Sequence, residues 1–290
     1  MSHFKRILPS LALAFTLAAC TDTAEETSPS EALESLSESP TPTTVVEKKD
    51  ESNAKQPLLH SSEELSKTDL ASRISSMQPS VARDRSLRFS DPQLLRADAA
   101  PLLLARLQNG DDSPEVKHAL IAALPKTKGQ YAQAVVDLLQ REESADLRAD
   151  LADSLRLSTE PAIALAGLKL AAADTSPDVR KRALYAIGRR KDGASLAGVL
   201  LHALGDSDTS VHSASAKALG NLQIKEAFTF LQAGLSSQSS DLRLETLRAM
   251  ARIDGSRAAN LPELATLIED SDARVRTAAA KVSVRGYGRN

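Results

Sequence analysis

The feature that most constrains the fold of this chain is a short phrase that it repeats. Two segments that begin at Asp111 and Asp174 read DDSPEVKHALIAALP and DTSPDVRKRALYAIG. Both have an acid, then Ser-Pro, a second acid, Val and a basic residue, and both continue into a run rich in Ala and Leu. The apolar residue of this phrase recurs at intervals of 31 to 33 residues, at Val116, Leu147, Val179, Val211, Leu242 and Val275. A period of this length predicts a repeated supersecondary unit.

Each unit begins with the signature of a helix start. The residue three places before the apolar position is always a good helix cap: Ser113, Ser144, Ser176, Asp208, Ser239 or Asp272. Pro114 and Pro177 follow two of these caps, where a helix tolerates proline. Eight residues after the apolar position, on the same helical face, come Leu124, Leu155, Ile187, Leu219 and Met250. Ser283 breaks this pattern in the last unit, and Gly188 and Gly220 suit a left-handed helix stop.

A second helix is expected in each unit, which makes the unit a helical hairpin. The expected segments are 130–139, 161–172, 194–204, 225–235 and 261–268, and residues 81–107 form a degenerate opening unit. Aromatic residues make up 3% of the chain and Trp is absent, while Ala and Leu, the strongest helix formers, dominate. The sequence therefore predicts an all-α solenoid of about six to seven hairpins over residues 81–290.

Two segments carry a family resemblance. ADTSPDVRKRALYAIG, from Ala173, and GDSDTSVHSASAKALG, from Gly205, follow the pattern D-x-x-x-x-V-R-x-x-A-x-x-A-L-G most closely. This pattern resembles HEAT repeats, in the short variety found in phycobilisome lyase subunits. The resemblance implies a right-handed α-α superhelix whose second helices line the concave face. The leading hypothesis for function is a scaffold whose extended repeat surface binds another protein.

The same family includes enzymes, and this gives an alternative function. One is a di-iron hydroxylase that acts on deoxyhypusine and uses His-Glu dipeptides as ligands; others are bilin lyases. Here the residues that follow His118, His202 and His212 are Ala, Ala and Ser, so the hydroxylase ligand set is not carried over. We expect no catalysis and no metal or other cofactor. The alternative is a metal-dependent hydroxylase or a bilin lyase-like enzyme with a site in the concave groove.

The N-terminus indicates export and a membrane anchor. Lys5 and Arg6 precede an apolar segment, 7–19, that is too short to span about 30 Å of hydrocarbon, which is typical of a signal peptide over 1–19. The segment ends Leu-Ala-Ala-Cys20, which resembles the lipobox of bacterial lipoproteins, and Cys20 is the chain's one cysteine. The resemblance implies cleavage before Cys20 and lipidation of its sulfur, with further acylation by a chain such as palmitate. Two or three acyl chains anchor a protein stably to a membrane.

The residue after the cysteine bears on which membrane is meant. In enteric bacteria an Asp there retains a lipoprotein in the inner membrane, and this chain has Thr21. We therefore expect a lipid-anchored, periplasm-facing protein of the bacterial cell envelope, in the outer membrane rather than the inner one. Asp22, one place further on, leaves the inner membrane open, because sorting rules differ between bacteria.

A tether is expected between the anchor and the repeats. Residues 20–60 are rich in Ser, Thr, Pro and Glu and poor in apolar residues, a composition typical of disorder. Residues 21–80 carry 12 acids and 5 bases, whereas residues 81–290 have a net charge of +3. Over 61–80 we expect a capping or linker helix with Ser61 as its cap and Glu64 completing a capping box. Leu70 and Ile74 would lie on its apolar stripe.

Some charges repeat with the units and are expected to be structural. Acids recur five residues before the apolar position, at Asp111, Glu142, Asp174, Asp206 and Asp270, with Ser237 the exception. Bases recur one residue after it, at Lys117, Arg148, Arg180, Arg243 and Arg276, with His212 the exception. An acid in a turn lies near the positive end of the next helix. A base can reach a neighbouring acid or an unpaired carbonyl.

One basic cluster does not repeat and is the candidate partner-binding site. It consists of Arg180, Lys181, Arg182, Arg189, Arg190 and Lys191. These bases could meet an acidic protein, an anionic lipid headgroup or the acidic tether, or they could simply be solvated helix ends. Nucleic acid is not expected as a partner, because the chain has a net charge of −2 and aromatic residues do not interleave the bases.

Overall fold

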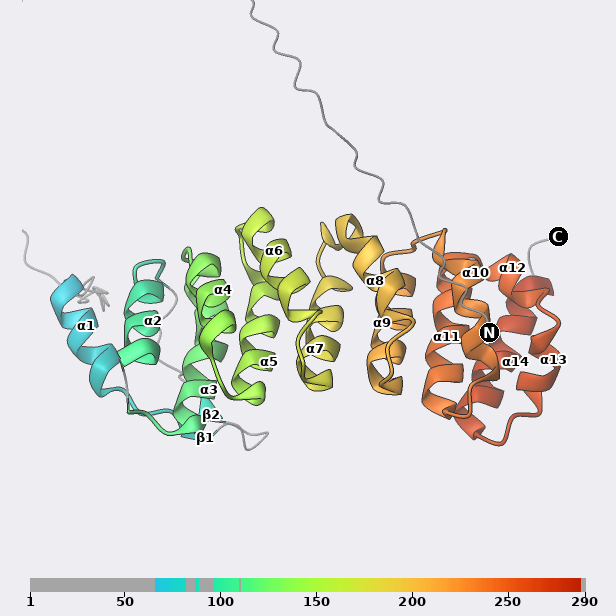
Figure 1. Cartoon of the computed structure of the whole chain (residues 1–290), viewed down its shortest axis with the longest axis horizontal. Helices are drawn as coiled ribbons and strands as arrows, with labels where there is room; N and C mark the ends of the chain where they lie inside the picture. Colours follow the sequence, from blue (N-terminus) through green and yellow to red (C-terminus); the bar gives the residue numbers. More distant parts are fainter. Residues whose placement is uncertain (1–65, 82–86, 89–95, 110, 288–290) are drawn as a thin grey trace, which may run out of the picture. The chain divides into compact units, whose positions relative to one another are not determined.

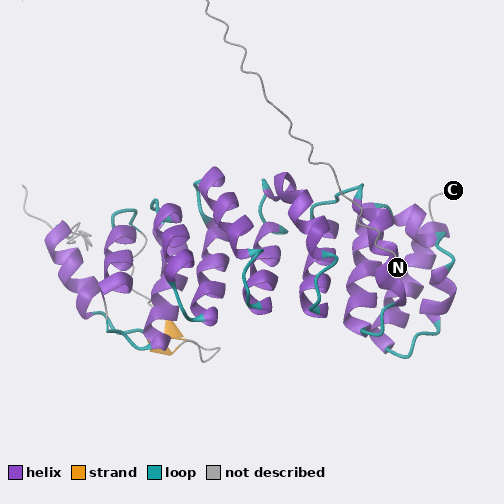
Figure 2. Ribbon diagram, in the orientation of Figure 1, coloured by secondary structure: helices purple, strands orange, loops and turns teal. Residues whose placement is uncertain are grey.

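The structure is a computed structural model that describes residues 66–81, 87–88, 96–109 and 111–287. Cys20, the signal peptide, the tether and the Ser61 capping box lie outside the described residues. Helices dominate the described part (Figures 1 and 2), and β1 (Ser80–Val81) and β2 (Leu87–Arg88) form a two-residue antiparallel pair. This pair falls in the opening unit, where we expected a helical hairpin and where α2 (Ala99–Asn109) is the described helix.

The helix predicted over 61–80 begins later than expected. α1 spans Lys67–Ser76, and its cap is Ser66, whose Oγ accepts a hydrogen bond from the backbone N–H of Asp69. The Ser66 hydroxyl also donates to the Asp69 carboxylate, 2.6 Å away. Leu70 and Ile74 are buried, as the predicted stripe requires, and α1 packs against α2.

The first helices of the six units begin where the sequence predicts. Each starts directly after its expected cap residue: α3 (Pro114–Ala123), α5 (Ala145–Ser154), α7 (Pro177–Ile187), α9 (Thr209–Asn221), α11 (Ser240–Ile253) and α14 (Ala273–Tyr287). The side chains of Ser144, Asp208, Ser239 and Asp272 accept hydrogen bonds from the first-turn amides. Ser113 and Ser176, which precede Pro114 and Pro177, make no such bond.

The first two second helices nearly match the predicted segments, whereas the last three are shorter and less regular than predicted. The second helices are α4 (Ala132–Arg141), α6 (Pro161–Ala171), α8 (Ala197–Ala203), α10 (Ala227–Leu231) and α13 (Glu263–Ile268). Among the described residues, the 3₁₀ segments η2 (Leu124–Thr127) and η3 (Leu155–Leu157) continue the first helices α3 and α5, η4 (Gly193–Leu196) leads into α8, and η5 (Gln232–Ser236) continues α10. The last hairpin also contains α12 (Gly255–Ala259), which the sequence pattern did not predict; Asp254 caps it by accepting from the Arg257 N–H at 2.9 Å.

The units stack in sequence order, as Figure 1 shows for residues 111–287. The first helices pack one on the next, α3 on α5, α5 on α7, α7 on α9, α9 on α11 and α11 on α14. The predicted inner positions are fully buried, with 0% exposure at Leu124, Leu155, Ile187, Leu219 and Met250. Each unit therefore completes its apolar core against its neighbours, and the predicted all-α solenoid is confirmed.

Gly188 and Gly220 have a different purpose from the one expected. Gly188 has a φ of −66°, Gly220 lies within α9, and no described glycine has a positive φ. A Cβ on Gly188 would lie 2.6 Å from the Cα of Ala218, and one on Gly220 would lie 2.5 Å from the Cα of Ala249. The two glycines are needed because successive first helices approach closely.

Candidate binding surface

The repeating charges form ion pairs between neighbouring units. Arg180 donates from Nε and Nη2 to the carboxylate of Asp206, both at 2.8 Å, and from Nη1 to the carbonyls of Asp174 and Thr175. Each such arginine therefore joins the turn before its own helix to the next turn. The pairs Arg148–Asp174 and Arg243–Asp270 repeat this geometry. The hydrogen bond from Arg180 lowers the pKa of Asp206, because it stabilises the charged carboxylate. The predicted structural role is confirmed for these three pairs.

The exceptions to the charge pattern fall at one junction. His212 replaces the arginine in α9, and Ser237 replaces the acid in the turn that would receive it. Burial lowers the pKa of His212 because it disfavours the charged ring, so this junction lacks the permanent positive charge that Lys or Arg supplies at the same position in the other units. At the start of the array Asp111 is exposed, and the adjacent Asp112 instead accepts from Arg106 of α2 at 2.8 Å.

Two members of the predicted basic cluster are structural. Arg190 is 8% exposed, and its guanidinium pairs with Asp192 at 2.7 Å. Its Nη1 also donates to the carbonyls of Leu155 and Ser158, so it fixes the end of the preceding unit. Arg180 is held between two turns, as described above. Because these two guanidinium groups are committed to such bonds, we remove them from the candidate partner-binding residues.

The other four members do not form one site. Lys181 pairs with Asp178 and, with Arg182, lines an open groove of about 520 Å³ along α5, α7, α9 and α11. Arg189 lies over the ring of Tyr185, 5.3 Å from its centroid, and lines a separate hollow with Arg252. Lys191 is exposed. Closeness in sequence therefore does not bring these bases together, because they lie at opposite ends of one helix.

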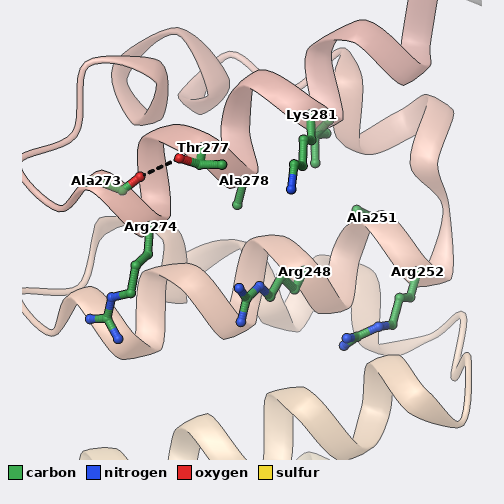
Figure 3. Close-up of a pocket in the computed structure, with 9 residues that line it drawn as sticks. Arg248, Ala251, Arg252, Ala273, Arg274, Thr277, Ala278 and Lys281 are labelled. Atoms are coloured by element: carbon green, nitrogen blue, oxygen red, sulfur yellow. Dashed lines mark hydrogen bonds between the residues drawn. The ribbon is translucent and has the colours of Figure 1, made fainter.

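A more strongly basic groove lies between α11 and α14 (Figure 3). We call it the C-terminal groove; it has a volume of about 550 Å³ and four cations line it: Arg248, Arg252, Arg274 and Lys281. Ala251, Ala278 and Val282 are among its apolar lining residues, and no acid lines it. The side chain of Lys281 points from α14 towards α11 (Figure 3).

Two of these four cations have ion-pair partners at the edge of the groove. Arg248 Nη1 lies 2.9 Å from Glu245, and Arg274 pairs with Asp241 at 2.9 Å and Asp272 at 2.7 Å. Among the described residues no carboxylate pairs with Arg252 or Lys281. The groove therefore presents excess positive charge over an apolar floor.

The position of these grooves was not predicted from the sequence. The sequence indicated that second helices line the concave face but did not indicate which face binds a partner; the two grooves are lined by first helices. A signal was present in the repeat register, because Lys217, Arg248 and Lys281 each stand six residues after the apolar position of their unit. Runs of adjacent bases do not reveal this signal, because its members lie in separate helices.

The histidines do not come together. His118 Nδ1 lies 2.6 Å from the Asp150 carboxylate, His202 is exposed, and His60 lies outside the described residues. Within the described part of the chain, no group of three or more metal-binding side chains is present. None of the described helices is long and apolar enough to cross a membrane.

This fold defines a class, the helical-repeat solenoids. Residues 165–251, from α6 into α11, match the family model for HEAT repeats. The segment that matches therefore consists of HEAT repeats, as the sequence resemblance implied. The match includes the Arg180–Asp206 pair and the two close-approach glycines, Gly188 and Gly220. A search of the curated proteins gives no match.

Several solved structures are similar to the chain. One is the complex of CpcE and CpcF of phycocyanin lyase from Nostoc sp. PCC7120, with 21% identity, a TM-score of 0.49, and coverage of 70% of this chain and 80% of that chain. An engineered protein has 20% identity, a TM-score of 0.47, and coverage of 76% and 96%. Human deoxyhypusine hydroxylase in complex with glycerol has 18% identity, a TM-score of 0.35, and coverage of 78% and 81%.

Proposed function

We propose that this protein is a lipid-anchored scaffold of the bacterial cell envelope that binds another protein through the exposed face of its first helices. One observation carries the proposal: buried apolar residues and the Arg–Asp pairs hold the stack, whereas the C-terminal groove also presents Arg252 and Lys281, which pair with no described carboxylate. Open grooves with an apolar floor and excess charge are suited to protein recognition.

The membrane anchor in this proposal is supported by the sequence. The short apolar segment before Cys20 and the lipobox-like Leu-Ala-Ala-Cys20 favour lipidation. The acidic segment that follows would give the repeats reach from the membrane. Thr21 favours the outer membrane, with the repeats facing the periplasm.

Site-specific photo-crosslinking tests the binding surface. A photoreactive amino acid at Arg252, in the C-terminal groove, is expected to give discrete protein adducts in the source bacterium. The same photoreactive amino acid at position Lys169, which is exposed on α6, is the matched control and should give no adducts. Adducts at neither Arg252 nor other first-helix positions would overturn the proposal.

The enzymatic alternative has its own measurement. The proposal includes no catalytic step, and this stays a prediction. Metal analysis and an absorption spectrum of the purified full chain are expected to show no stoichiometric iron and no visible chromophore. Either one would favour the alternative of an enzyme.

A further inference from the structure

We infer that Lys217, Arg248 and Lys281 form a binding row for an extended acidic segment of a partner protein. The inference rests on the proposed function and deepens it, since it names the residues and the chemistry of the partner. These three residues lie on α9, α11 and α14, at the same place in three consecutive units.

The register separates this row from the residues that hold the fold. In earlier units the same position is Ala122, Asp153 and Tyr185, so the stack does not require a base there. The arginines of the Arg–Asp pairs stand one residue after the apolar position of their unit, and the buried core residues stand eight after it. Three consecutive units have a base at this position, and these bases belong neither to the Arg–Asp pairs nor to the buried core. This indicates that they contact a partner outside the chain.

The spacing of the row suits an extended peptide. α9 packs on α11 and α11 on α14, and packed helix axes lie about 8–10 Å apart. A peptide in the polyproline II conformation has three residues per turn and advances about 3.1 Å per residue, so carboxylates three residues apart lie on one face and are separated by about 9 Å. A peptide that crosses the three helices with an acid at every third position could therefore meet each base in turn. Arg248, the central base of the row, could bind a carboxylate of the peptide through two hydrogen bonds.

The surroundings of the row favour an acidic protein segment. Arg252 and Arg274 add positive charge beside Arg248 and Lys281, and Ala278 gives an apolar floor. Asp153, Asp241 and Glu245 line the groove that holds Lys217, and Asp272 pairs with Arg274 at the edge of the C-terminal groove. No aromatic residue lines the C-terminal groove, so the stacking platform typical of single-stranded nucleic acid is missing from these lining residues.

A synthetic peptide tests the inference directly. The probe is a fluorescein-labelled peptide of nine residues with Glu at every third position and Ser elsewhere, and its control has Gln for Glu. Fluorescence anisotropy with the full chain in detergent, at low salt, gives both affinities. We expect the Glu peptide to bind at least ~10-fold more tightly than the Gln peptide, because charge complementarity is the main contribution.

The variants locate the site. Lys217→Gln, Arg248→Gln and Lys281→Gln combined should weaken binding of the Glu peptide at least ~10-fold. Arg141→Gln, Lys169→Gln and Lys225→Gln combined remove three exposed bases outside the first helices and should change the affinity less than ~2-fold. Unchanged circular dichroism and thermal midpoints in both triple variants would show that the fold is kept.

Three results would overturn the inference. They are no binding of the Glu peptide, equal loss in both triple variants, or single-stranded DNA that binds the row more tightly than the peptide does. Crosslinking distinguishes failure of the row from failure of the proposed function. If crosslinking from the first helices still captures a partner when the row is neutralised, the scaffold stands and the row is wrong. If no position captures a protein, both are wrong.

Discussion

Ser176 and Asp208 occupy the same place at the start of successive first helices but satisfy the helix differently. The Asp208 carboxylate accepts from the N–H groups of Ser210 and Val211, at 2.8 and 3.3 Å. The Ser176 side chain accepts from none, while Pro177 after it removes one amide that would need a partner. The identity of a cap residue thus predicts where a helix begins, but not which atoms hold it.

Asp208→Ala and Ser176→Ala are expected to differ in stability. The first removes two hydrogen bonds at the cap and should lower the free energy of unfolding by about 1 kcal/mol. The second removes none and should lower it by less than ~0.5 kcal/mol. Urea unfolding of the full chain measures both, and an equal loss in the two variants would contradict the assignment of the caps.

The close-approach glycines give a second prediction. Gly188→Ala or Gly220→Ala would place a methyl group against the backbone of the next first helix and should destabilise the protein by about 1–3 kcal/mol. Gly198→Ala in α8 is the control, because nothing lies within 4 Å of its added Cβ. That variant should be neutral or more stable by up to ~1 kcal/mol, since alanine favours helix. If all three behave alike, the packing argument is wrong.

At the scale of the helix and its turn, the Arg–Asp pairs join each unit to the next. The side chains of Arg180 and Asp206 are 17% and 13% exposed, so solvent screens them less than a surface pair. Arg180→Ala should lower the free energy of unfolding by about 1–3 kcal/mol, because it leaves a carboxylate and two carbonyls without their donor. Lys181→Ala, which removes an exposed pair, should change it by less than ~1 kcal/mol. Thermal or urea unfolding compares them, and a reversed order would contradict the account.

The same pairs predict how stability depends on pH. Hydrogen bonds from arginine lower the pKa of Asp174, Asp206 and Asp270 below the ordinary value of 3.8. Their contribution is therefore complete above about pH 4–5 and is lost as the pH falls through the lowered values. Urea unfolding between pH 3 and 7 should show a small loss of stability below about pH 6.5, where the buried His212 ring must become charged, and the main decline below about pH 4, which is shallower in Asp206→Asn. If most of the free energy of unfolding is lost near pH 6–7, the histidines and not the Arg–Asp pairs would control the pH dependence.

The first helices could be predicted from the sequence far better than the second. A cap, an apolar anchor and a second apolar residue eight places on specify the first helices that begin after Ser113 to Ser239, and the cap and the anchor alone specify the last one, after Asp272. The second helices have no such caps; α10 is one short helix continued as η5, and α12 was missed. The ends of the second helices depend on packing against neighbouring units, and the sequence pattern of one unit carries no information about that packing. The same reason applies to the groove, since its bases come from separate helices.

At the scale of the whole molecule, the proposed anchor is tested at Cys20. Cys20→Ala should release the protein from the membrane fraction or leave its signal segment uncleaved, because the acylated sulfur is the expected anchor. Fractionation and mass spectrometry of the source bacterium, with wild type as control, give both outcomes. A variant that is fully cleaved and still bound to membranes would contradict lipidation at this residue.

The central claim is that the residues that hold the stack and those that bind a partner are separate sets. Measuring the thermal midpoint and the affinity for the Glu peptide on the same two variants, Arg180→Ala and Lys217→Gln/Arg248→Gln/Lys281→Gln, tests it most directly. The account predicts that the first lowers the thermal midpoint and keeps the affinity at 25 °C, whereas the second keeps the midpoint and weakens binding at least ~10-fold. If each variant changes both quantities together, or if the row variant changes neither, the claim is contradicted.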